Sequence, residues 1–333
     1  MIGAIVITHN SEDVIASCIE ACLRHSIFDV VIVDNNSQDS TASVAARYPG
    51  VRVVANKVNR GFAAAVNQGF DLLEHSIVLL LNPDAVLTSG LDELVAAAEE
   101  PGSGIAGGRL LDASSGRTQD GFNVRAFPTP LTLVFETLGL NRIWPGNAIN
   151  QRYRLTLDAR ERVDVDQPAG AFLAIRREVW QQAGGFDESF YPVWFEDVDF
   201  CKRVRALGYR IRYVPGATAR HSGGHSVGKL PMDSRPIYWY GSLLRYASKH
   251  FTYAGKAGVC MAVMAACWPR MMAEALIQRT VRPISAYCRV IYIALQHLVG
   301  AAGRKGESSA QLGSSLRRRE QDTGTVVNVK QYK

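Results

Sequence analysis

The sequence contains no CxxC pair, no cluster of cysteine with histidine and no internal repeat. Its six cysteines are scattered, and no signal peptide precedes the first apolar segment, which favours free thiols in a reducing cytoplasm. A GxGxxG motif is also missing after that segment, because Thr8 to Glu12 contains no glycine. This absence disfavours a nucleotide-binding oxidoreductase.

No uncharged run in the C-terminal third is long enough to span a membrane. Ala257 to Trp268 has twelve residues between Lys256 and Arg270, whereas a spanning helix needs about 20. Ile284 to Val299 is interrupted by an arginine and a histidine. We therefore expect amphipathic helices on a membrane surface, with aromatic side chains at the interface and basic ones facing lipid headgroups. The alternative is a helical bundle packed on the rest of the chain.

Charge is divided unevenly along the chain, whose net charge is +6. Residues 236–333 contain fourteen Lys and Arg against four Asp and Glu, whereas residues 1–235 contain 23 against 27. We interpret residues 1–235 as a catalytic domain, 236–302 as an amphipathic helical extension and 303–333 as a disordered basic tail. The two parts are expected to meet different partners, and we expect no nucleic acid among them.

Apolar strands alternate with helical segments before the extension. The predicted strands are Ile2–Thr8, Asp29–Val33, Val51–Ala55, Ile77–Leu81, Gly104–Leu110, Gly170–Ile175 and Arg210–Val214. Helices are predicted up to about His25 and at Gly61–Leu73, Leu91–Glu99, Arg177–Ala183 and Glu196–Leu207. This spacing predicts right-handed βαβ units and a doubly wound, mainly parallel α/β sheet. In the irregular region between them, the apolar block Leu131–Leu140 is either a core helix or a site for a greasy acceptor.

Polar clusters follow three of the predicted strands: Thr8 to Glu12, Asp34 to Asp39, and Asn82 to Asp84. Because the carboxyl ends of parallel strands share one edge of a doubly wound sheet, these clusters can line a single crevice. An acidic crevice cannot hold a diphosphate by itself, but Mg²⁺ or Mn²⁺ held by Asp84 would resolve the conflict. Taken alone, a strand-end aspartate is more often a turn residue.

Five motifs, in this order, resemble those of family 2 glycosyltransferases and, within that family, the bacterial rhamnosyltransferase-like branch. They are Ile5-Val6-Ile7-Thr8-His9-Asn10, Val33-Asp34-Asn35-Asn36-Ser37, the segment Asn59 to Gly69, Asn82-Pro83-Asp84, and Trp194-Phe195-Glu196-Asp197-Val198-Asp199. The resemblance covers roughly residues 1–225. It implies a GT-A nucleotide-diphospho-sugar transferase fold and direct inversion at the anomeric carbon of a sugar.

The resemblance also assigns the donor side of the site. Asp34 is expected to bind the pyrimidine ring, with Thr8, Asn10 and Glu12 lining the base and ribose pocket. Asp84 matches the last aspartate of the DxD metal motif, whose first aspartate is replaced by Asn82, so metal binding is expected to depend on the nucleotide. His221 matches the histidine that completes the metal site, with His225 as its substitute.

Further assignments concern the diphosphate, the sugar and the acceptor. Arg60 is expected to reach the diphosphate, although without the resemblance it reads as a surface arginine. Gly170 resembles the small residues that line the sugar site. Asp197 is expected to be the catalytic base, with Glu196 orienting the acceptor, although capping alone would explain acidic residues at a helix start. Trp194 and Phe195 could stack on the acceptor or belong to the core.

These observations predict a cytoplasmic-face, metal-dependent inverting glycosyltransferase. The donor implied by the branch is dTDP-rhamnose, and the basic, apolar C-terminal third suggests a membrane-linked saccharide acceptor on the inner face of the plasma membrane. A catalytically silent sugar-nucleotide-binding or scaffold protein, or a transferase of the same fold with a UDP-sugar donor, remains as an alternative.

Overall fold

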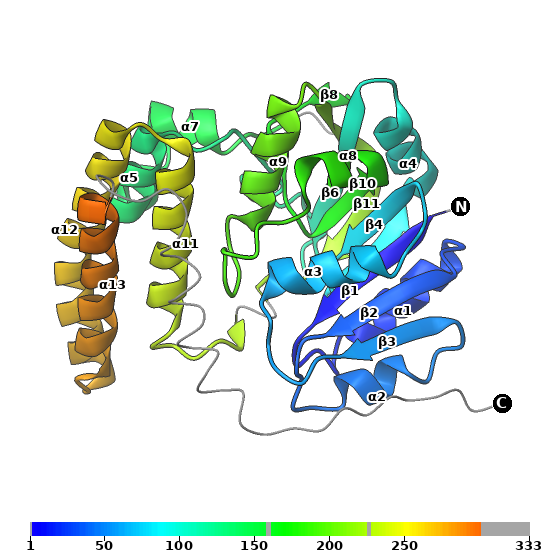
Figure 1. Cartoon of the computed structure of the whole chain (residues 1–333), viewed down its shortest axis with the longest axis horizontal. Coiled ribbons are helices and arrows are strands. Elements are labelled where there is room, and N and C mark those ends of the chain that lie inside the picture. Colours follow the sequence, from blue (N-terminus) through cyan, green and yellow to red (C-terminus); the bar gives the residue numbers. More distant parts are fainter. Residues whose placement is uncertain (1, 158–160, 225–227, 301–333) are drawn as a thin grey trace.

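The computed structural model describes residues 2–157, 161–224 and 228–300 (Figure 1). His225 and the predicted tail 303–333 lie outside the described residues. A mixed sheet forms the centre of the molecule, with strand order β3-β2-β1-β4-β10-β6-β11-β5 and β8 added against β11. All six cysteines are free thiols, as expected.

One half of the sheet is parallel and is built from the predicted strands β1 (Gly3–Thr8), β2 (Asp29–Asp34), β3 (Val51–Ala55) and β4 (Ile77–Leu81). The side chains of β1 and β4 are buried throughout, which explains their continuous apolar runs. In the register of β1 and β2, Thr8 pairs with Asp34. The polar residues after these strands therefore share one edge of the sheet, as the sequence predicted.

The other half of the sheet is mixed. It contains β5 (Ala85–Ser89), β6 (Ser103–Asp112), β10 (Phe172–Arg176), β11 (Arg210–His221) and the short β8 (Val163–Asp164), with β10 antiparallel to both β4 and β6. The prediction that the last strand ends at Val214 was wrong. The chain bulges between Val214 and Thr218 and then continues the ladder, so that β11 ends at His221.

Helices cover both faces of the sheet, which confirms the doubly wound α/β architecture. One face packs α1 (Ile15–Arg24), α2 (Thr41–Ala45) and α4 (Leu91–Glu99). The other face packs α3 (Phe62–Asp71), α8 (Arg177–Ala183) and α9 (Glu196–Ala206). Alanines at 63 and 65 keep α3 close to the strands beneath it.

Short elements fill the irregular region: β7 (Val124–Arg125) pairs with β9 (Gln167–Pro168), and α5 (Pro130–Leu138), α6 (Leu140–Ile143) and α7 (Ala148–Tyr153) lie beyond the sheet. Of the apolar block on α5, only Leu133 is fully buried, and it packs into the core of the C-terminal helices. Leu131 and Leu138 are partly exposed. The block is therefore a helix on the C-terminal layer and not part of the sheet core.

Three helices form that C-terminal layer beside the sheet: α11 (Arg235–His250), α12 (Tyr253–Gln278) and α13 (Arg282–Val299) (Figure 1). They share a third apolar core, which also takes in Phe195 and Val198 from the start of α9. The layer is thus packed on the rest of the chain, as the alternative interpretation held, and α11 forms the contact.

The sequence argument that the apolar run is too short to span a membrane does not hold for the whole helix. By length and composition α12 is able to cross a membrane, with a mean hydropathy of 1.3 in its best window, of which 33% is buried. Its inner face packs on α13, α5 and α11. Its outer face exposes apolar side chains at helical spacing: Met261, Trp268, Met272 and Leu276. Exposed Tyr292, Leu295 and Val299 continue this surface on α13.

Candidate active site

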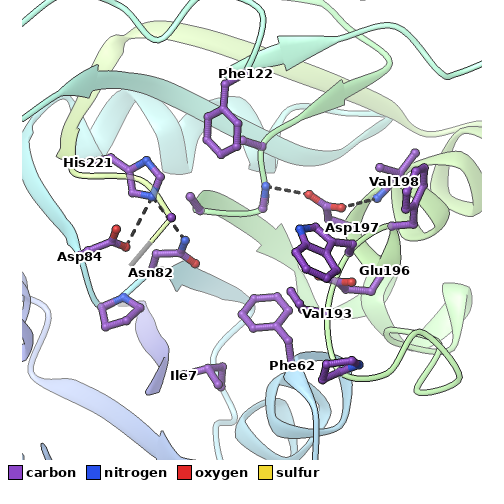
Figure 2. Close-up of a pocket in the computed structure, with 18 of the residues that line it drawn as sticks. Ile7, Phe62, Asn82, Asp84, Phe122, Val193, Glu196, Asp197, Val198 and His221 are labelled. Carbon is purple, nitrogen blue, oxygen red and sulfur yellow. Dashed lines mark hydrogen bonds and ion pairs between the residues drawn. The ribbon is translucent and has the colours of Figure 1, made fainter. Parts of the chain in front are cut away.

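A cavity of about 420 Å³ opens at the carboxyl ends of β1 and β4 and extends to the start of α9 (Figure 2). Nine of the predicted site residues line it. They are Thr8, Asn82, Asp84, Gly170, Trp194, Phe195, Glu196, Asp197 and His221. The structure therefore brings Asp84, predicted for the metal, together with the residues predicted for the acceptor, which lie more than 100 positions away in the sequence.

The metal end of the cavity is formed by Asp84 and His221. His221 pairs with Ala85 in the β11–β5 ladder, and this register sets its imidazole beside Asp84, with Nε2 3.5 Å from Oδ1. Both side chains are buried, at 6% and 1% exposure. The backbone N–H of Gly223 donates to Asp84 Oδ2 at 3.0 Å. The Asn82 amide nitrogen lies 3.5 Å from the same Nε2.

Gln119 fixes the orientation of His221. Its Nε2 donates to the backbone carbonyl of His221 at 2.9 Å, so its Oε1 is the atom that lies 2.9 Å from His221 Nδ1. An amide oxygen is an acceptor, which places the imidazole proton on Nδ1. The lone pair on Nε2 then faces Asp84, which is the arrangement a metal-ligating histidine needs.

This pair fits a divalent cation in part. Two ligands of one octahedral Mg²⁺ or Mn²⁺ lie roughly 3 Å apart, close to the 3.5 Å between Asp84 Oδ1 and His221 Nε2. A carboxylate oxygen and a neutral imidazole are suitable ligands for Mn²⁺. Among the described residues, however, no group of three or more His, Cys, Asp or Glu could hold a metal. Such a cation would need phosphate oxygens or water to complete its coordination.

Asp197 lies at the other end of the cavity, in the first turn of α9 (Figure 2). Its Oδ2 accepts a hydrogen bond from the N–H of Gly170 at 3.1 Å and its Oδ1 one from the N–H of Val198 at 2.8 Å. Burial raises the pKa of Asp197, while these donors and the charge of Arg125 act in the opposite direction. A Cβ at Gly170 would come 3.0 Å from Oδ2, so a side chain there would crowd the carboxylate.

Glu196 is only 4% exposed, and its Oε2 has no hydrogen-bond partner among the described residues. Burial, with a further contribution from the Asp197 charge, raises the pKa of Glu196 well above its usual value. A buried carboxyl with an unpartnered oxygen is costly in an empty cavity, but it is available to a ligand.

The residues before α9 are held in strained conformations. Trp194 and Phe195 have φ values of 82° and 70°, in the left-handed region that costs a side chain about 1–3 kcal/mol. Packing against α11 holds them there, because the Trp194 ring meets Trp239 at 5.5 Å and the Phe195 ring meets Tyr246 at 5.3 Å. Phe195 is 6% exposed and belongs to the C-terminal core as well as to the cavity wall.

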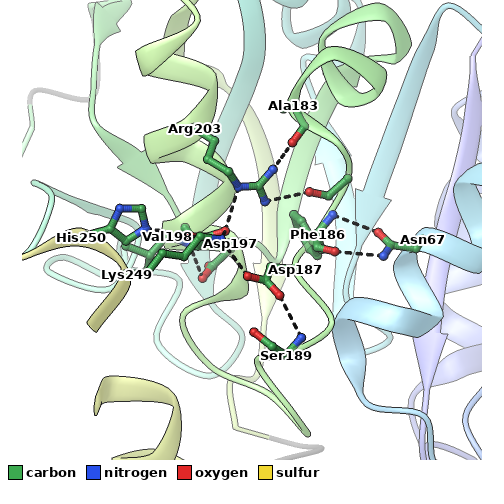
Figure 3. A network of polar contacts seen from close by, with 12 residues as sticks. Asn67, Ala183, Phe186, Asp187, Ser189, Asp197, Val198, Arg203, Lys249 and His250 are labelled. Atoms are coloured by element: carbon green, nitrogen blue, oxygen red, sulfur yellow. Dashed lines mark hydrogen bonds and ion pairs between the residues drawn. The ribbon is translucent and has the colours of Figure 1, made fainter. Parts of the chain in front are cut away.

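A buried ion network fastens α11 to α9 (Figure 3). Asp199 is fully buried and lies 2.8 Å from Arg203 Nε, 2.9 Å from Lys249 Nζ and 2.7 Å from His250 Nε2. Lys249 also contacts Asp187 at 2.7 Å. Burial opposes ionisation of Asp199, but hydrogen bonds from His250 and Lys249 outweigh it and lower its pKa to about 2. The helix that carries Asp197 is thereby tied to the C-terminal layer.

On the donor side, the loops after β1 and β2 bind each other. Thr8 Oγ1 donates to Asp34 Oδ1 at 2.7 Å, and Asp34 is 3% exposed. Asn10 Oδ1 accepts from the N–H of Gln38 at 2.7 Å, and Glu12 Oε2 accepts from the N–H of Ser40 at 2.9 Å. Thr8 reaches the cavity wall, whereas the cavity lining does not include Asp34, Asn10 or Glu12.

Arg60 is also absent from the cavity lining; it is exposed and lies 3.3 Å from Gln68 Oε1. Two cavity-end residues were missed by the sequence analysis, Arg125 in the lining and Gln119 behind His221. Both come from the irregular region, where neither motif nor periodicity singles them out. The only signal was their place in the chain, in the irregular segment between β6 and β10.

Comparisons with known proteins agree with this geometry. The family model described as Glycosyl transferase family 2 matches residues 4–179. The N-acetylglucosaminyl-diphospho-decaprenol L-rhamnosyltransferase of Mycobacterium tuberculosis (strain ATCC 25618 / H37Rv) is 30% identical over 236 residues, which covers 66% of this chain and 75% of that protein. The rhamnosyltransferase WbbL of Escherichia coli (strain K12) is 25% identical, over 75% of this chain and 93% of that protein.

A solved structure of GalNAc-T7 with UDP, GalNAc and Mn²⁺ has a similar fold, with a TM-score of 0.51 at 16% identity over 75% of this chain and 50% of that one. This likeness confirms the GT-A type of architecture. The five motifs, the family match over more than half of the chain and the mycobacterial relative point the same way. The chain belongs to glycosyl transferase family 2.

Proposed function

We propose that this protein is a metal-dependent inverting glycosyltransferase that moves L-rhamnose from dTDP-rhamnose onto a lipid-linked saccharide in the synthesis of a cell-envelope glycan. The observation that carries the proposal is one cavity with Asp84 and His221 at one end and Glu196 and Asp197 at the other. The rhamnosyl group is suggested by the names of the mycobacterial and E. coli relatives, and the lipid-linked acceptor by that of the mycobacterial one. The dTDP nucleotide is suggested by the resemblance of the motifs to the rhamnosyltransferase-like branch.

The nucleotide is proposed to bind at the edge formed by β1 and β2. Thr8 lines the cavity there, and Asp34 is held rigid by Thr8 and by the N–H of Ser37 at 3.1 Å. In the proposal Asp34 recognises the pyrimidine, and Asn10 and Glu12 shape the pocket by holding the loop after β2. Arg60 remains a proposed diphosphate contact on the strength of the resemblance; in this structure it is exposed and lies outside the cavity lining.

Asp84 and His221 are proposed to hold Mg²⁺ or Mn²⁺ together with the donor's phosphates. Bound there, the cation supplies positive charge for the diphosphate that leaves. Asn82, in place of a second aspartate, leaves one carboxylate at this end, so the protein alone gives a weak site. Gln119 keeps the Nε2 lone pair of His221 directed at the cation.

Asp197 is proposed to act as the base. It takes the proton of the acceptor hydroxyl, whose oxygen forms the new bond to the anomeric carbon while the bond from that carbon to the nucleoside diphosphate breaks. Burial favours this step, because a carboxylate with a raised pKa is a stronger base. The N–H groups of Gly170 and Val198 hold both oxygens and so fix the direction of the proton transfer.

The acceptor is proposed to enter beside α9. Glu196 offers its unpartnered Oε2 for a hydrogen bond to the acceptor sugar, and Trp194 supplies an apolar face for it. Phe195 supports this wall from the core side.

The C-terminal layer is proposed to rest on the inner face of the plasma membrane, which carries such an acceptor. The exposed side chains of Met261, Trp268, Met272 and Leu276 make an apolar stripe over four turns of α12. Arg282 and Arg289 are exposed on α13, and Arg289 lies one turn before the exposed Tyr292. Deletion of the extension is a poor test, because α11 is part of the core around α9. A point change on the stripe, Trp268→Glu, is expected to lower binding to phosphatidylglycerol-containing vesicles several-fold, while Gln181→Glu on α8 serves as the charge-matched control. Equal binding of both variants would contradict membrane contact.

The proposed activity is tested by incubating the protein with dTDP-rhamnose or UDP-sugars, Mn²⁺ and an N-acetylglucosaminyl-diphospho-polyprenol. Acceptor-dependent release of dTDP and a product of inverted anomeric configuration are expected. Release from a UDP-sugar alone would move the donor assignment to UDP. Donor binding without any release would support a silent sugar-nucleotide-binding protein.

A further inference from the structure

The charges that line the cavity do not balance for a diphosphate ligand. Three carboxylates face it, from Asp84, Glu196 and Asp197. Among the described residues that line it, Arg125 is the only lysine or arginine. A divalent cation bound to the Asp84 carboxylate leaves one net positive charge at the metal end, whereas a diphosphate carries roughly one negative charge per phosphate and so about two in all. A second positive charge is needed to balance the diphosphate, and among the residues that line the cavity the Arg125 side chain supplies it.

The Arg125 side chain is held in place by backbone pairing, a hydrogen bond and two aromatic rings. It lies on β7, where its backbone pairs with Gln167, and its Nε donates to the carbonyl of Gly121 at 2.9 Å. The guanidinium packs over the ring of Phe122 at 5.4 Å and that of Tyr153 at 5.9 Å. These two ring contacts and the Nε hydrogen bond hold the guanidinium in place. In the described part of the chain the two Nη atoms have no hydrogen-bond partner.

The position of Arg125 is between the two ends of the cavity. Phe122 contacts Arg125 and also stacks on His221, with ring centroids 5.6 Å apart at 13°. On the other side, the charge of Arg125 acts directly on Asp197. A ligand that reached from the metal residues to the base would pass the Arg125 guanidinium.

We propose that Arg125 is a phosphate-binding residue, whose Nη groups donate paired hydrogen bonds to a diphosphate in the cavity. The planar fork of arginine suits two phosphate oxygens, and the half-buried setting strengthens the contact. The inference rests on the proposed function, because it assumes a diphosphate substrate. The diphosphate belongs either to the donor nucleotide or to the lipid-linked acceptor, and the chemistry of recognition is the same for both.

The test compares Arg125→Met and Arg125→Lys with Arg205→Met, which removes an exposed arginine in the last turn of α9 that does not line the cavity. Titration calorimetry with dTDP and dTMP in the presence of Mn²⁺ tests whether Arg125 binds the diphosphate of the donor. The KM values for a diphosphate-linked and a phosphate-free acceptor test whether it binds the diphosphate of the acceptor. For the donor source, Arg125→Met is expected to weaken dTDP binding roughly ten- to hundredfold and dTMP binding much less. The affinity of Arg125→Lys for dTDP is expected to lie between those of wild type and Arg125→Met, and the affinity of Arg205→Met is expected to stay near wild type.

For the acceptor source, dTDP binding is expected to stay unchanged in Arg125→Met, while the KM for the diphosphate-linked acceptor rises about tenfold or more relative to the phosphate-free one. If Arg125→Met unfolds at the wild-type temperature and changes neither the affinity for dTDP nor the KM for the diphosphate-linked acceptor, the proposal is overturned. In that case a shift in the pH dependence of kcat/KM would assign Arg125 to the support of Asp197. If wild-type protein binds no nucleoside diphosphate at all, the proposed function itself fails and this inference with it.

Discussion

The two ends of the cavity are built in different ways. At the metal end, Asp84 and His221 sit at neighbouring strand ends, and hydrogen bonds from Gly223 and Gln119 hold them in place. At the base end, Glu196 has an unpartnered oxygen, and the residues before it are strained. The metal end therefore follows from sheet register, whereas the base end depends on side-chain packing from a distant part of the chain.

That dependence gives the C-terminal layer a second role besides its proposed membrane contact. Trp239 and Tyr246 of α11 pack on the strained residues, and Lys249 and His250 bind Asp199 two positions after the base. A substitution in α11 is therefore expected to disturb the positions of Glu196 and Asp197 more than those of Asp84 and His221.

The largest effect is expected for Asp197→Asn. The amide keeps the shape and one acceptor oxygen but cannot take a proton, so acceptor-dependent transfer should fall about 10²- to 10⁴-fold. Initial rates of nucleotide release measure this, with Asp120→Asn as a control. In wild type, burial raises the pKa of Asp197, so kcat/KM should increase with pH through a pKa above that of an ordinary aspartate. A variant with unimpaired transfer would rule out Asp197 as the base.

Asp199→Asn tests whether the base end depends on the ion network. Removing one partner of a buried charge cluster typically costs about 3–5 kcal/mol, because Arg203 and His250 then lose their counter-ion and Lys249 keeps only Asp187. Since the pKa of Asp199 is lowered to about 2, its stabilisation is present at neutral pH and is lost as pH falls toward that value. Urea unfolding should show a wild-type advantage at pH 7 that narrows in acid. Exposed Asp71→Asn is the control, and a comparable loss there would contradict the network's importance.

Gln119→Met tests the metal end alone. Without the amide, Nδ1 of His221 loses its acceptor and the tautomer is no longer fixed, so the Mn²⁺ concentration for half-maximal donor binding should rise about 10- to 100-fold. Thermal unfolding in the presence of donor, at a series of Mn²⁺ concentrations, measures it. The control Gln181→Met, on the surface of α8, should leave this Mn²⁺ concentration unchanged. If Gln119→Met also leaves the Mn²⁺ concentration for half-maximal donor binding unchanged, Gln119 does not support metal binding.

Glu196→Gln should have the smallest effect, and unlike Asp199→Asn it should stabilise the protein at neutral and higher pH. Because burial raises the pKa of Glu196, the folded state favours the protonated form, and this stabilisation is lost as pH rises through the folded-state pKa. The amide mimics the protonated acid. The variant should unfold at the wild-type temperature near pH 4 and a few degrees higher at pH 8, roughly 2–4 °C for each kcal/mol. The same pH trend in exposed Glu99→Gln would contradict the explanation.

The contrast between the two ends also explains how far the sequence could be read. Buried strands and polar strand ends predicted the sheet and the shared edge, because these depend on local patterns and on parallel topology. The pairing of Asp84 with His221 was implied by the family resemblance alone, since it depends on the antiparallel register of β11 and β5. The extension of β11 to His221 was missed, since a bulge after Val214 restores the ladder beyond an apparent strand end. The length of α12 was missed because Lys256, which bounds the apolar run, is buried within the helix.

Other features had no local signal. Arg125 and Gln119 lie in a segment without periodicity, and only the closure of the tertiary structure brings them to the cavity. Conversely, the motif placed Asn10, Glu12 and Arg60 around the nucleotide. The structure shows how the first two hold loops together and how Arg60 lies on the surface, which leaves their roles toward the donor as proposals.

The most direct test of separate metal and base ends is calorimetric titration of dTDP-rhamnose, with and without Mn²⁺, into wild-type protein, Asp197→Asn and His221→Ala. We predict that Asp197→Asn binds the donor as tightly as wild type and with the same dependence on Mn²⁺. His221→Ala should lose most of the gain in affinity that Mn²⁺ gives. Loss of the Mn²⁺-dependent gain in both variants, or in neither, would contradict the account.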